Sequence, residues 1–233
     1  MEKKEWGLSG GALKIIALVT MILDHATAVF VNYYEQTALY NAGRCIGRLS
    51  FPIYCFLLVE GFCYTRNVKK YSLRLFLFAL VSEMPFDLAF FGCIYWGHQN
   101  VFFTLFLGLL AIWITDTAIK KCSNLAAGKV MCCAGLIVIY FACYFVRADY
   151  GFYGVCLIFL FYVFRAQKEK VAASNVVING IMALNGNCQI FGGFSSILIA
   201  FYNGEKGISL KYFFYAIYPI HLLLFYWLEY YIF

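Results

Sequence analysis

The sequence predicts an all-α fold, a polytopic bundle of transmembrane helices, and two observations lead to this prediction. The first is composition: 64% of the 233 residues are hydrophobic and 13% are charged, whereas soluble domains are about half apolar and about a quarter charged. So small a polar fraction cannot cover a water-soluble core of this size. The second is a series of apolar stretches of about 20 residues, the length that a helix needs to cross the hydrocarbon layer.

Nine such stretches can be drawn along the chain. They cover 11–31, 47–65, 71–92, 101–119, 129–146, 149–164, 171–185, 188–203 and 211–231. The polar turns between them leave no room for a soluble domain, so we expect residues 1–233 to form a single integral membrane domain. The sixth and seventh stretches are short, which leaves counts of eight or ten spans open.

The lysine and arginine residues between these stretches predict the orientation of the chain in the membrane. One set of alternate loops carries fourteen: Lys3, Lys4, Arg66, Lys69, Lys70, Arg74, Lys120, Lys121, Lys129, Arg165, Lys168, Lys170, Lys206 and Lys211. The other set carries three: Arg44, Arg48 and Arg147. Cytoplasmic loops hold the excess of positive charge, so the N-terminus is predicted to be cytoplasmic and the C-terminus external. The chain is expected to be a multi-pass protein of the cell (plasma) membrane. Its net charge of +6 is then a topology signal that implies no nucleic-acid partner.

Several ionisable residues lie inside the predicted spans, where each costs several kcal/mol unless it is paired or hydrated. They are Lys14, Asp24 and His25 in the first span, Arg48 and Glu60 in the second, Arg74, Glu83 and Asp87 in the third, and His221 in the last. The first span is also too long for a signal peptide and lacks a small-residue cleavage pattern. A plain hydrophobic anchor would not carry these charges, so they are candidates for function.

Helical spacing predicts which of these side chains lie together. Lys14 and His25 are separated by about three helical turns, which places them on one face with a rise of roughly 16 Å between them. Glu83 and Asp87 have the i, i+4 spacing and share a face of the third span. The predicted orientation brings five residues to a similar depth: Asp24, His25, Arg48, Glu83 and Asp87.

A purely structural interpretation stays open for part of this set. Glu83 and Asp87 can serve to hold three helices together by pairing with Arg48. His221 can be a buried, hydrogen-bonded histidine next to a proline kink.

A basic cluster lies at the predicted cytoplasmic edge. Arg66, Lys69, Lys70 and Arg74 fall within nine residues, and Lys14 is expected at nearly the same level. Charge-assisted hydrogen bonds would suit this cluster to phosphate groups. The positive-inside asymmetry explains the loop as well as phosphate binding does, so both interpretations stay open.

No metal site is expected. None of the ten cysteines forms a C-x-x-C pair, and those in apolar runs are expected to pack as small hydrophobic residues. Cys45 and Cys93 are the two that we expect near the external face. His25, His98 and His221 are the only histidines, and no H-E-x-x-H spacing links them.

Five stretches of the chain closely resemble the TraX family. They are LKIIALVTMILDHA (13–26), GRLSFPIYCFLLVEGF (47–62), RLFLFALVSEMPFDLAF (74–90), HQNVFFTLFLGLL (98–110) and KYFFYAIYPIHLLL (211–224). The resemblance is strongest over 13–110 and 211–224 and weak over 120–210. The family is named for a conjugation protein that acetylates the N-terminus of pilin.

A more distant resemblance is to the transmembrane acyltransferases of the acyltransferase type 3 group. These have a basic residue, ten intervening positions and an essential histidine in the first span. Lys14 and His25 reproduce that spacing, with lysine in place of the usual arginine. The group holds the nucleotide end of coenzyme A with cytoplasmic arginines, and the implied counterparts here are Arg66 and Arg74.

These resemblances imply a membrane-embedded acyltransferase that moves an acetyl group from cytoplasmic acetyl-CoA to an acceptor amine or hydroxyl near the external face. The implied donor site consists of Lys14, Arg66, Lys70 and Arg74. The implied catalytic set consists of His25, Asp24, Glu83, Asp87, Arg48 and Asn100. In this set His25 is the general base, Asp24 or Glu83 orients its ring, and Arg48 or Asn100 stabilises the oxyanion. The acceptor stays open between a protein N-terminus, a sugar, a lipid and a small amine.

Two other classes of function stay open. Intramembrane Asp, Glu and His side chains also relay protons in ion-coupled transporters, although the sequence shows no two-half repeat with interrupted helices. A non-catalytic membrane assembly partner is the other class. For that class, Asp24, His25 and Glu83 should be replaceable together by apolar residues.

Overall fold

The computed structural model describes residues 6–122, 125–208 and 211–232, and it confirms the all-α prediction. The helices are α1 (Gly10–Phe30), α2 (Thr37–Gly47), α3 (Ser50–Tyr64), α4 (Val68–Phe91), α5 (Val101–Lys121), α6 (Leu125–Val146), α7 (Gly151–Val163), α8 (Lys168–Met182), the 3₁₀ segments η1 (Ala183–Asn185) and η2 (Cys188–Phe194), α9 (Ser195–Ala200) and α10 (Lys211–Tyr231). Across these ranges β pairing is confined to two isolated bridges, Leu8 with Tyr202 and Gln99 with Ala148.

All nine predicted stretches are helical, with two corrections. Residues 32–46 were expected to form an external loop, but most of them form α2. The stretch 188–203 was expected to be one helix, and it is instead the 3₁₀ segment η2 followed by the short α9. Helix α2 is less apolar than the predicted spans, and it packs closely against α1.

Two glycines explain how α2 lies so close to α1. A Cβ added at Gly43 would collide with the Thr27 side chain, and one added at Gly47 would collide with that of Asp24. Glycines four residues apart let two helix backbones approach closely. This close approach brings the polar residues of α2 against Asp24.

Four helices in the described ranges are long and apolar enough to cross a membrane. They are α1, the α2–α3 segment Thr37–Tyr64, α5, and Ala126–Val146 of α6. The helix α7 and the η2–α9 segment Cys188–Ala200 are apolar but shorter. In α6 only 11% of the most apolar window is buried inside the protein, which indicates that this helix presents most of its apolar surface outward. These features support a polytopic helical bundle.

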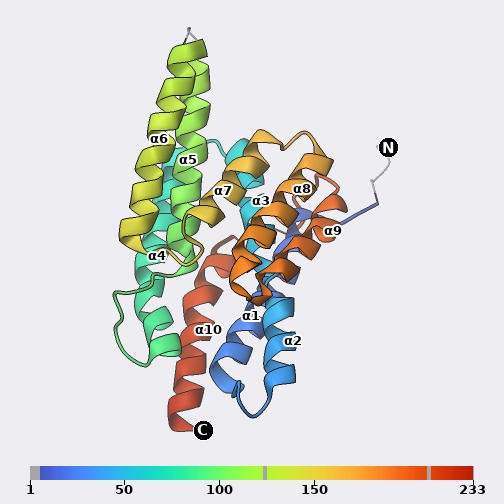
Figure 1. Ribbon diagram of the computed structural model, residues 1–233, viewed down its shortest axis with the longest axis vertical. Coiled ribbons are helices and arrows are strands. Elements are labelled where there is room, and N and C mark those ends of the chain that lie inside the picture. The colour runs from blue at the N-terminus through green and yellow to red at the C-terminus, as the bar shows by residue number, and fades with distance from the viewer. Residues whose placement is uncertain (1–5, 123–124, 209–210, 233) are drawn as a thin grey trace.

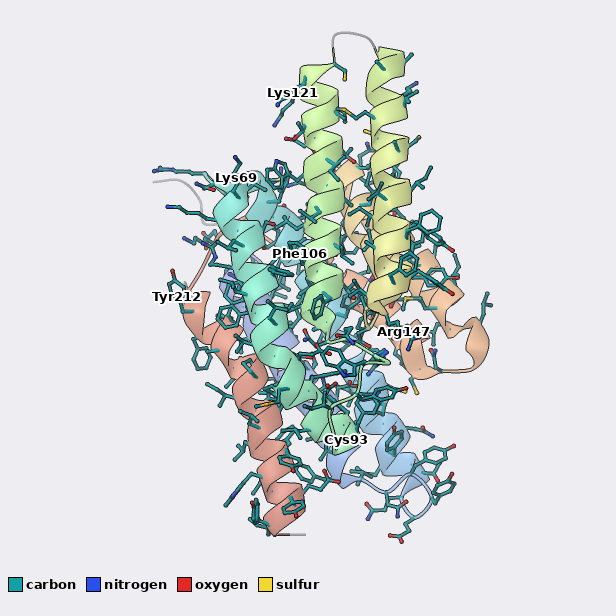
Figure 2. The ribbon with its side chains drawn as sticks, turned by 90° about the vertical axis from the view of Figure 1, so that its left-hand side faces the viewer. Lys69, Cys93, Phe106, Lys121, Arg147 and Tyr212 are labelled. Atoms are coloured by element: carbon teal, nitrogen blue, oxygen red, sulfur yellow. The ribbon has the colours of Figure 1, made fainter. Side chains whose placement is uncertain are left out.

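The helices are arranged along one long axis. Helices α5 and α6 lie side by side and project beyond the other helices at one end, while the C-terminus of α10 lies at the other end (Figure 1). Lys69 and Lys121 lie toward the first end and Cys93 toward the second (Figure 2). Lys69 and Lys121 belong to loops predicted to be cytoplasmic and Cys93 to one predicted to be external, and the orientation itself stays a prediction. Lys3 and Lys4, which belong to the cytoplasmic count, lie outside the described residues.

The core of the bundle lies where α1, α3, α5 and α7 meet. Side chains with no exposed surface there include Leu13, Ile53, Ile112 and Leu157. Polar side chains are buried next to this core, among them Asn100, Thr104 and Asn175, each with no exposed surface. Burying such groups is costly unless they are hydrogen-bonded, so their partners define the site described next.

Candidate active site

Helices α1 and α10 bring two histidines together. His25 Nδ1 lies 2.7 Å from His221 Nε2, and the two rings are nearly parallel, with centroids 5.1 Å apart and an interplanar angle of 9°. His221 is buried, with 4% of its surface exposed. Its Nδ1 lies 2.7 Å from the backbone carbonyl oxygen of Ile217, one turn earlier in α10.

These contacts assign the tautomer of both rings. A carbonyl oxygen can only accept a hydrogen bond, so His221 Nδ1 carries the hydrogen and His221 Nε2 carries a lone pair. His25 Nδ1–H must then be the donor to His221 Nε2. The lone pair of His25 is therefore on Nε2, which has no hydrogen-bond partner among the residues that the structure describes. A lone pair held in this way can accept a proton.

The His25 ring is held between aromatic side chains. It makes edge-on contacts with Phe90 of α4, at a centroid distance of 5.3 Å, and with Tyr218 of α10, at 5.8 Å. Lower on the same face of α1, the Lys14 ammonium lies over the Phe214 ring of α10, 5.9 Å from its centroid. Lys14 and His25 thus both face α10, which confirms the predicted shared face.

Asp24, the neighbour of His25, points into a different environment. Its carboxylate lies between two arginines of the α2 segment: Arg48 Nη2 is 2.6 Å from Oδ1, and Arg44 Nη1 is 2.9 Å from Oδ2. The Asp24 side chain is only 8% exposed. Asp24 was expected to orient the imidazole of His25, but the structure gives that contact to His221.

Arg48 is held from two sides and keeps one unused donor. Its Nη2 bonds to Asp24 and its Nη1 lies 3.4 Å from the Oε1 atom of Gln189 in η2. Its Nε is buried and has no hydrogen-bond partner within the described ranges. A buried N–H without a partner is rare and calls for an explanation, such as a ligand atom.

Gln189 connects Arg48 to a buried amide network. Gln189 Nε2 donates to Asn179 Oδ1 at 2.8 Å, and Asn179 Nδ2 donates to Asn175 Oδ1 at 2.8 Å. Asn175 Nδ2 in turn donates to Ser195 Oγ at 2.9 Å. The network ties α8 to η2 and α9 and supports Arg48 from behind. These residues were not among the predicted site residues, because neutral amides give no charge signal and lie in the region of weak resemblance.

Glu83, Asp87 and Asn100 form a second polar group, at the junction of α4 and α5. The side chain and backbone nitrogens of Asn100 both donate to Glu83 Oε2, the latter at 3.2 Å, and Asn100 Nδ2 also donates to the carbonyl of Ala79 at 2.8 Å. Asp87 Oδ2 accepts from the backbone N–H of Tyr95 at 2.9 Å. Arg48, which one interpretation paired with these two carboxylates, binds Asp24 instead.

Each of these carboxylates keeps one buried oxygen unused. Glu83 Oε1 and Asp87 Oδ1 are both inaccessible to solvent and accept no hydrogen bond from any described residue. The two residues share one face of α4 with Phe90, which contacts His25. Both amide hydrogens of Asn100 are already donated, so Asn100 has no donor left for a ligand, and its side chain also caps α5 by accepting from the Phe102 N–H.

An open cavity of about 480 Å³ is lined by His98, Arg147, Asp149 and Tyr150, among others. His98 Nε2 lies 3.0 Å from Asp149 Oδ1. This hydrogen bond raises the pKa of His98, which lies in the loop before α5, above its ordinary value. Arg147, with φ of 55°, is in the left-handed region that non-glycine residues seldom adopt.

The basic residues at the opposite end fall into two groups. Arg74 lies over the Tyr71 ring, 5.6 Å from its centroid, and interacts electrostatically with Tyr215 of α10. Its Nε is buried without a hydrogen-bond partner in the described ranges. Arg66 and Lys70 are exposed.

Glu60, another predicted intramembrane charge, also lies apart from this site. Its Oε1 is 2.6 Å from Nε of Arg165, which follows α7. This ion pair joins α3 to α7, so Glu60 stabilises the bundle.

Comparison with known proteins identifies the family. The family model described as TraX protein matches residues 9–229. The chain is 31% identical to the probable fimbrial assembly protein FimC, serogroup H1, of Dichelobacter nodosus, over 91% of this chain and 92% of that protein. No solved structure matches the chain. The match to the family model extends over nearly the whole bundle and includes both histidines and the acidic and basic residues of the site, so the chain belongs to the TraX family.

Proposed function

We propose that this protein is a membrane-embedded acetyltransferase that uses His25 as its general base and acetyl-CoA as its donor. The observation that carries the proposal is the His25–His221 pair, which leaves a lone pair on His25 Nε2. A general base needs a fixed tautomer with an available lone pair in reach of the proton that it removes. His221 is then a positioning residue, since it acts on the acceptor only through His25.

The proposed reaction transfers the acetyl group directly. An acceptor that arrives as an ammonium first loses one proton to solvent; His25 Nε2 then removes a proton from the neutral acceptor, whose nitrogen or oxygen attacks the carbonyl carbon of the thioester. The C–S bond breaks, and the departing thiolate of coenzyme A takes the proton back from His25. The His221 contact to His25 Nδ1–H orients the ring throughout, as the carboxylate does in a hydrolase triad.

Arg48 is the proposed oxyanion donor. Negative charge develops on the carbonyl oxygen as the acceptor attacks, and a preorganised N–H stabilises that charge. The Arg48 Nε–H is buried and unused, whereas both amide hydrogens of Asn100 are donated elsewhere. This difference favours Arg48 over Asn100 as the proposed donor.

The unused oxygens of Glu83 and Asp87 favour an amine over a hydroxyl as the acceptor. An ammonium group has three donors and a positive charge, so it can fill both vacant acceptor positions at once. A hydroxyl has one donor and would leave one carboxylate oxygen unsatisfied, which costs about 1–3 kcal/mol. We further propose that the acceptor approaches this side of the site from the cavity lined by His98 and Tyr150.

The cytoplasmic basic residues are proposed to bind the phosphates of the donor. Lys14 and Arg74 lie against neighbouring residues of α10, Phe214 and Tyr215. Lys14 and His25 face α10 from one helix, with a rise of roughly 16 Å between them. An extended thioester arm can bridge such a separation, which would place the acetyl group beside His25.

The test is transfer of label from acetyl-CoA in membranes that contain wild-type protein, His25→Ala or His221→Leu, with mass spectrometry of the product that gains label. We expect both variants to lose activity by about 10²–10⁴-fold. Ile220→Ala is the matched control, because Ile220 precedes His221 and is 57% exposed; its activity should match the wild type. Wild-type label transfer by His25→Ala would contradict the proposal.

The name of the D. nodosus relative supports a second candidate, a non-catalytic role in fimbrial assembly. The two candidates differ in their need for His25. If the His25→Ala variant restores assembly of surface fibres to a deletion strain while no label is transferred by the wild type, the assembly role is supported and the acetyltransferase is not.

A further inference from the structure

Arg147 ends α6 in a backbone conformation that otherwise belongs to glycine in the described part of this chain. Its φ is 55°, and every other positive φ among the described residues occurs at a glycine. Gly92 ends α4 in the same way, with φ of 67° and its N–H donated to the carbonyl four residues earlier at 3.1 Å. The Arg147 N–H makes the equivalent bond to Cys143 at 3.0 Å. Glycine is the usual residue at such a helix end, so an arginine there indicates a role for its side chain.

The backbone around Arg147 is held in this conformation from outside α6. The Gln99 N–H donates to the Arg147 carbonyl oxygen at 3.0 Å, next to the isolated bridge between Gln99 and Ala148. Ala148 is buried, and its carbonyl oxygen accepts from the Gly151 N–H at 2.8 Å. The left-handed conformation of Arg147 is therefore fixed by its surroundings and is not a feature of a loose loop.

The Arg147 side chain is exposed and lines the open cavity of about 480 Å³. Its guanidinium makes no hydrogen bond or ion pair with any residue that the structure describes. Asp149 lies only two residues further on, but its carboxylate is engaged by His98 Nε2 at 3.0 Å. The planar fork of N–H donors on Arg147 is thus left for a ligand, and its geometry matches the two oxygens of a carboxylate.

The charge of the cavity lining limits what can bind there. Arg147 and a protonated His98 supply positive charge, and Asp149 supplies one negative charge, so the lining carries at most one net positive charge. A singly charged anion matches this lining. A phosphate monoester carries about −1.5 to −2 at pH 7 and would exceed it.

Another part of the lining is apolar and comes from a single short segment. Leu184 of η1 is 81% exposed and Ile181 of α8 is 41% exposed, so both offer apolar surface to a ligand. Together with Met182 they line the cavity. One apolar segment suits an anion with a single apolar substituent, as a carboxylate has, better than a phosphodiester, which has two. The cavity volume is within the range of about 300–1,000 Å³ that is typical of small-ligand sites.

We propose that this cavity is a binding site for a carboxylate carried on an apolar group. Arg147 binds the carboxylate through two parallel N–H···O bonds, and the segment 181–184 contacts the apolar group. The proposal concerns binding alone, so it holds or fails independently of the acetyltransferase reaction.

The test is isothermal titration calorimetry of the full-length protein in detergent with three probes. N-acetylleucine carries both features, N-acetylleucinamide lacks the charge, and N-acetylglycine lacks the apolar side chain. We expect the wild type to bind N-acetylleucine at least about tenfold more tightly than its amide, since hydrogen bonds to charged groups are the strong ones. It should bind N-acetylleucine roughly fivefold more tightly than N-acetylglycine, because the leucine side chain is partly buried on binding.

The variants separate the two halves of the site. Arg147→Gly should lose the preference for the acid over the amide and melt no lower than the wild type, because glycine adopts this φ without strain. Arg147→Lys keeps the charge without the fork and should lose most of the preference. Leu184→Ser should lose the preference for N-acetylleucine over N-acetylglycine. Lys121→Ala is the matched control: Lys121 is an exposed cation that lies well away from Arg147 along the bundle (Figure 2), so its removal should change neither preference.

Four results would overturn the proposal. The first is equal binding of the acid and the amide by the wild type, or no saturable binding of either. The second is an unchanged preference in Arg147→Gly. The third is an equal loss of preference in Lys121→Ala, which would trace the effect to the net charge of the protein. The fourth is displacement of N-acetylleucine by dimethyl phosphate as effectively as by acetate, which would assign the cavity to phosphodiesters.

Discussion

Neutralising Asp24 should destabilise this protein more than any other single change of charge to amide in the bundle. The Asp24 carboxylate contacts two guanidinium groups, with Arg48 Nη2 at 2.6 Å and Arg44 Nη1 at 2.9 Å. The three side chains are 8%, 16% and 25% exposed, so water screens their charges poorly. In Asp24→Asn the site holds two positive charges with no negative charge between them.

The size of the effect follows from this geometry. Removing one partner of a buried ion pair costs about 3–5 kcal/mol, because the remaining charge is left buried without compensation. For a chain of this length that cost corresponds to a drop in melting temperature of roughly 6–20 °C. Asp116→Asn is the matched control. Asp116 pairs with Lys120, whose side chain is 71% exposed, so its loss should cost at most about 1 kcal/mol.

The assay is thermal unfolding in detergent, followed with a thiol-reactive dye that reports the exposure of buried cysteines such as Cys55 and Cys143. The double variant Asp24→Asn/Arg44→Gln removes one of the two stranded positive charges. Its destabilisation should therefore be smaller than the sum of the two single effects, as coupled neighbours require. If Asp24→Asn melts within the range of the Asp116→Asn control, or if the two changes are additive, this electrostatic reasoning is wrong.

Three further results are expected. The hydrogen bond to Asp149 raises the pKa of His98, so its stabilisation is complete below the unfolded value of about 6.5 and is lost as the pH rises through the raised value. The melting temperature of the wild type should fall across that window relative to His98→Gln, and parallel curves would contradict it. Glu60→Gln should cost about 1–3 kcal/mol, less than Asp24→Asn, because Arg165 is 36% exposed and can turn toward water; an equal loss would refute this ranking. Arg74→Ala should raise the apparent KM for acetyl-CoA more than it lowers kcat, and equal changes in both would remove Arg74 from the proposed phosphate site.

Patterns within single segments of the sequence, hydropathy and helical spacing, predicted the apolar helices and the faces that their charged residues share. A hydropathy scan finds α1, α5 and α6 because each needs only its own composition to be recognised. The i, i+4 rule places Glu83 and Asp87 together because that relation lies within one helix. The sequence prediction placed α2 in a loop, because the position of this helix depends on the fit of Gly43 and Gly47 against another helix.

Contacts between distant segments were not predictable in this way. His25 and His221 belong to the first and last long helices, and no local pattern states that α10 packs on α1. His221 was correctly treated as a candidate for a buried, hydrogen-bonded histidine, and the structure adds that its partner is His25. Arg44 was counted only as a loop charge, although its spacing of four residues from Arg48 would place both on one face once α2 is known to be a helix.

The adjacent residues Asp24 and His25 explain why one helix can serve two chemically different environments. Consecutive side chains on a helix point about 100° apart, so α1 directs the carboxylate toward Arg44 and Arg48 and the imidazole toward His221. The carboxylate is thereby fully used in holding the arginines, and the imidazole is positioned by a neutral partner. The separation of the two environments matters in the proposed reaction. A carboxylate shared between the arginines and the imidazole would either release an arginine or lose contact with the base. A shift of α1 would disturb both environments at once, so the α1–α2 contact at Gly43 and Gly47 positions the base as well as the ion pair.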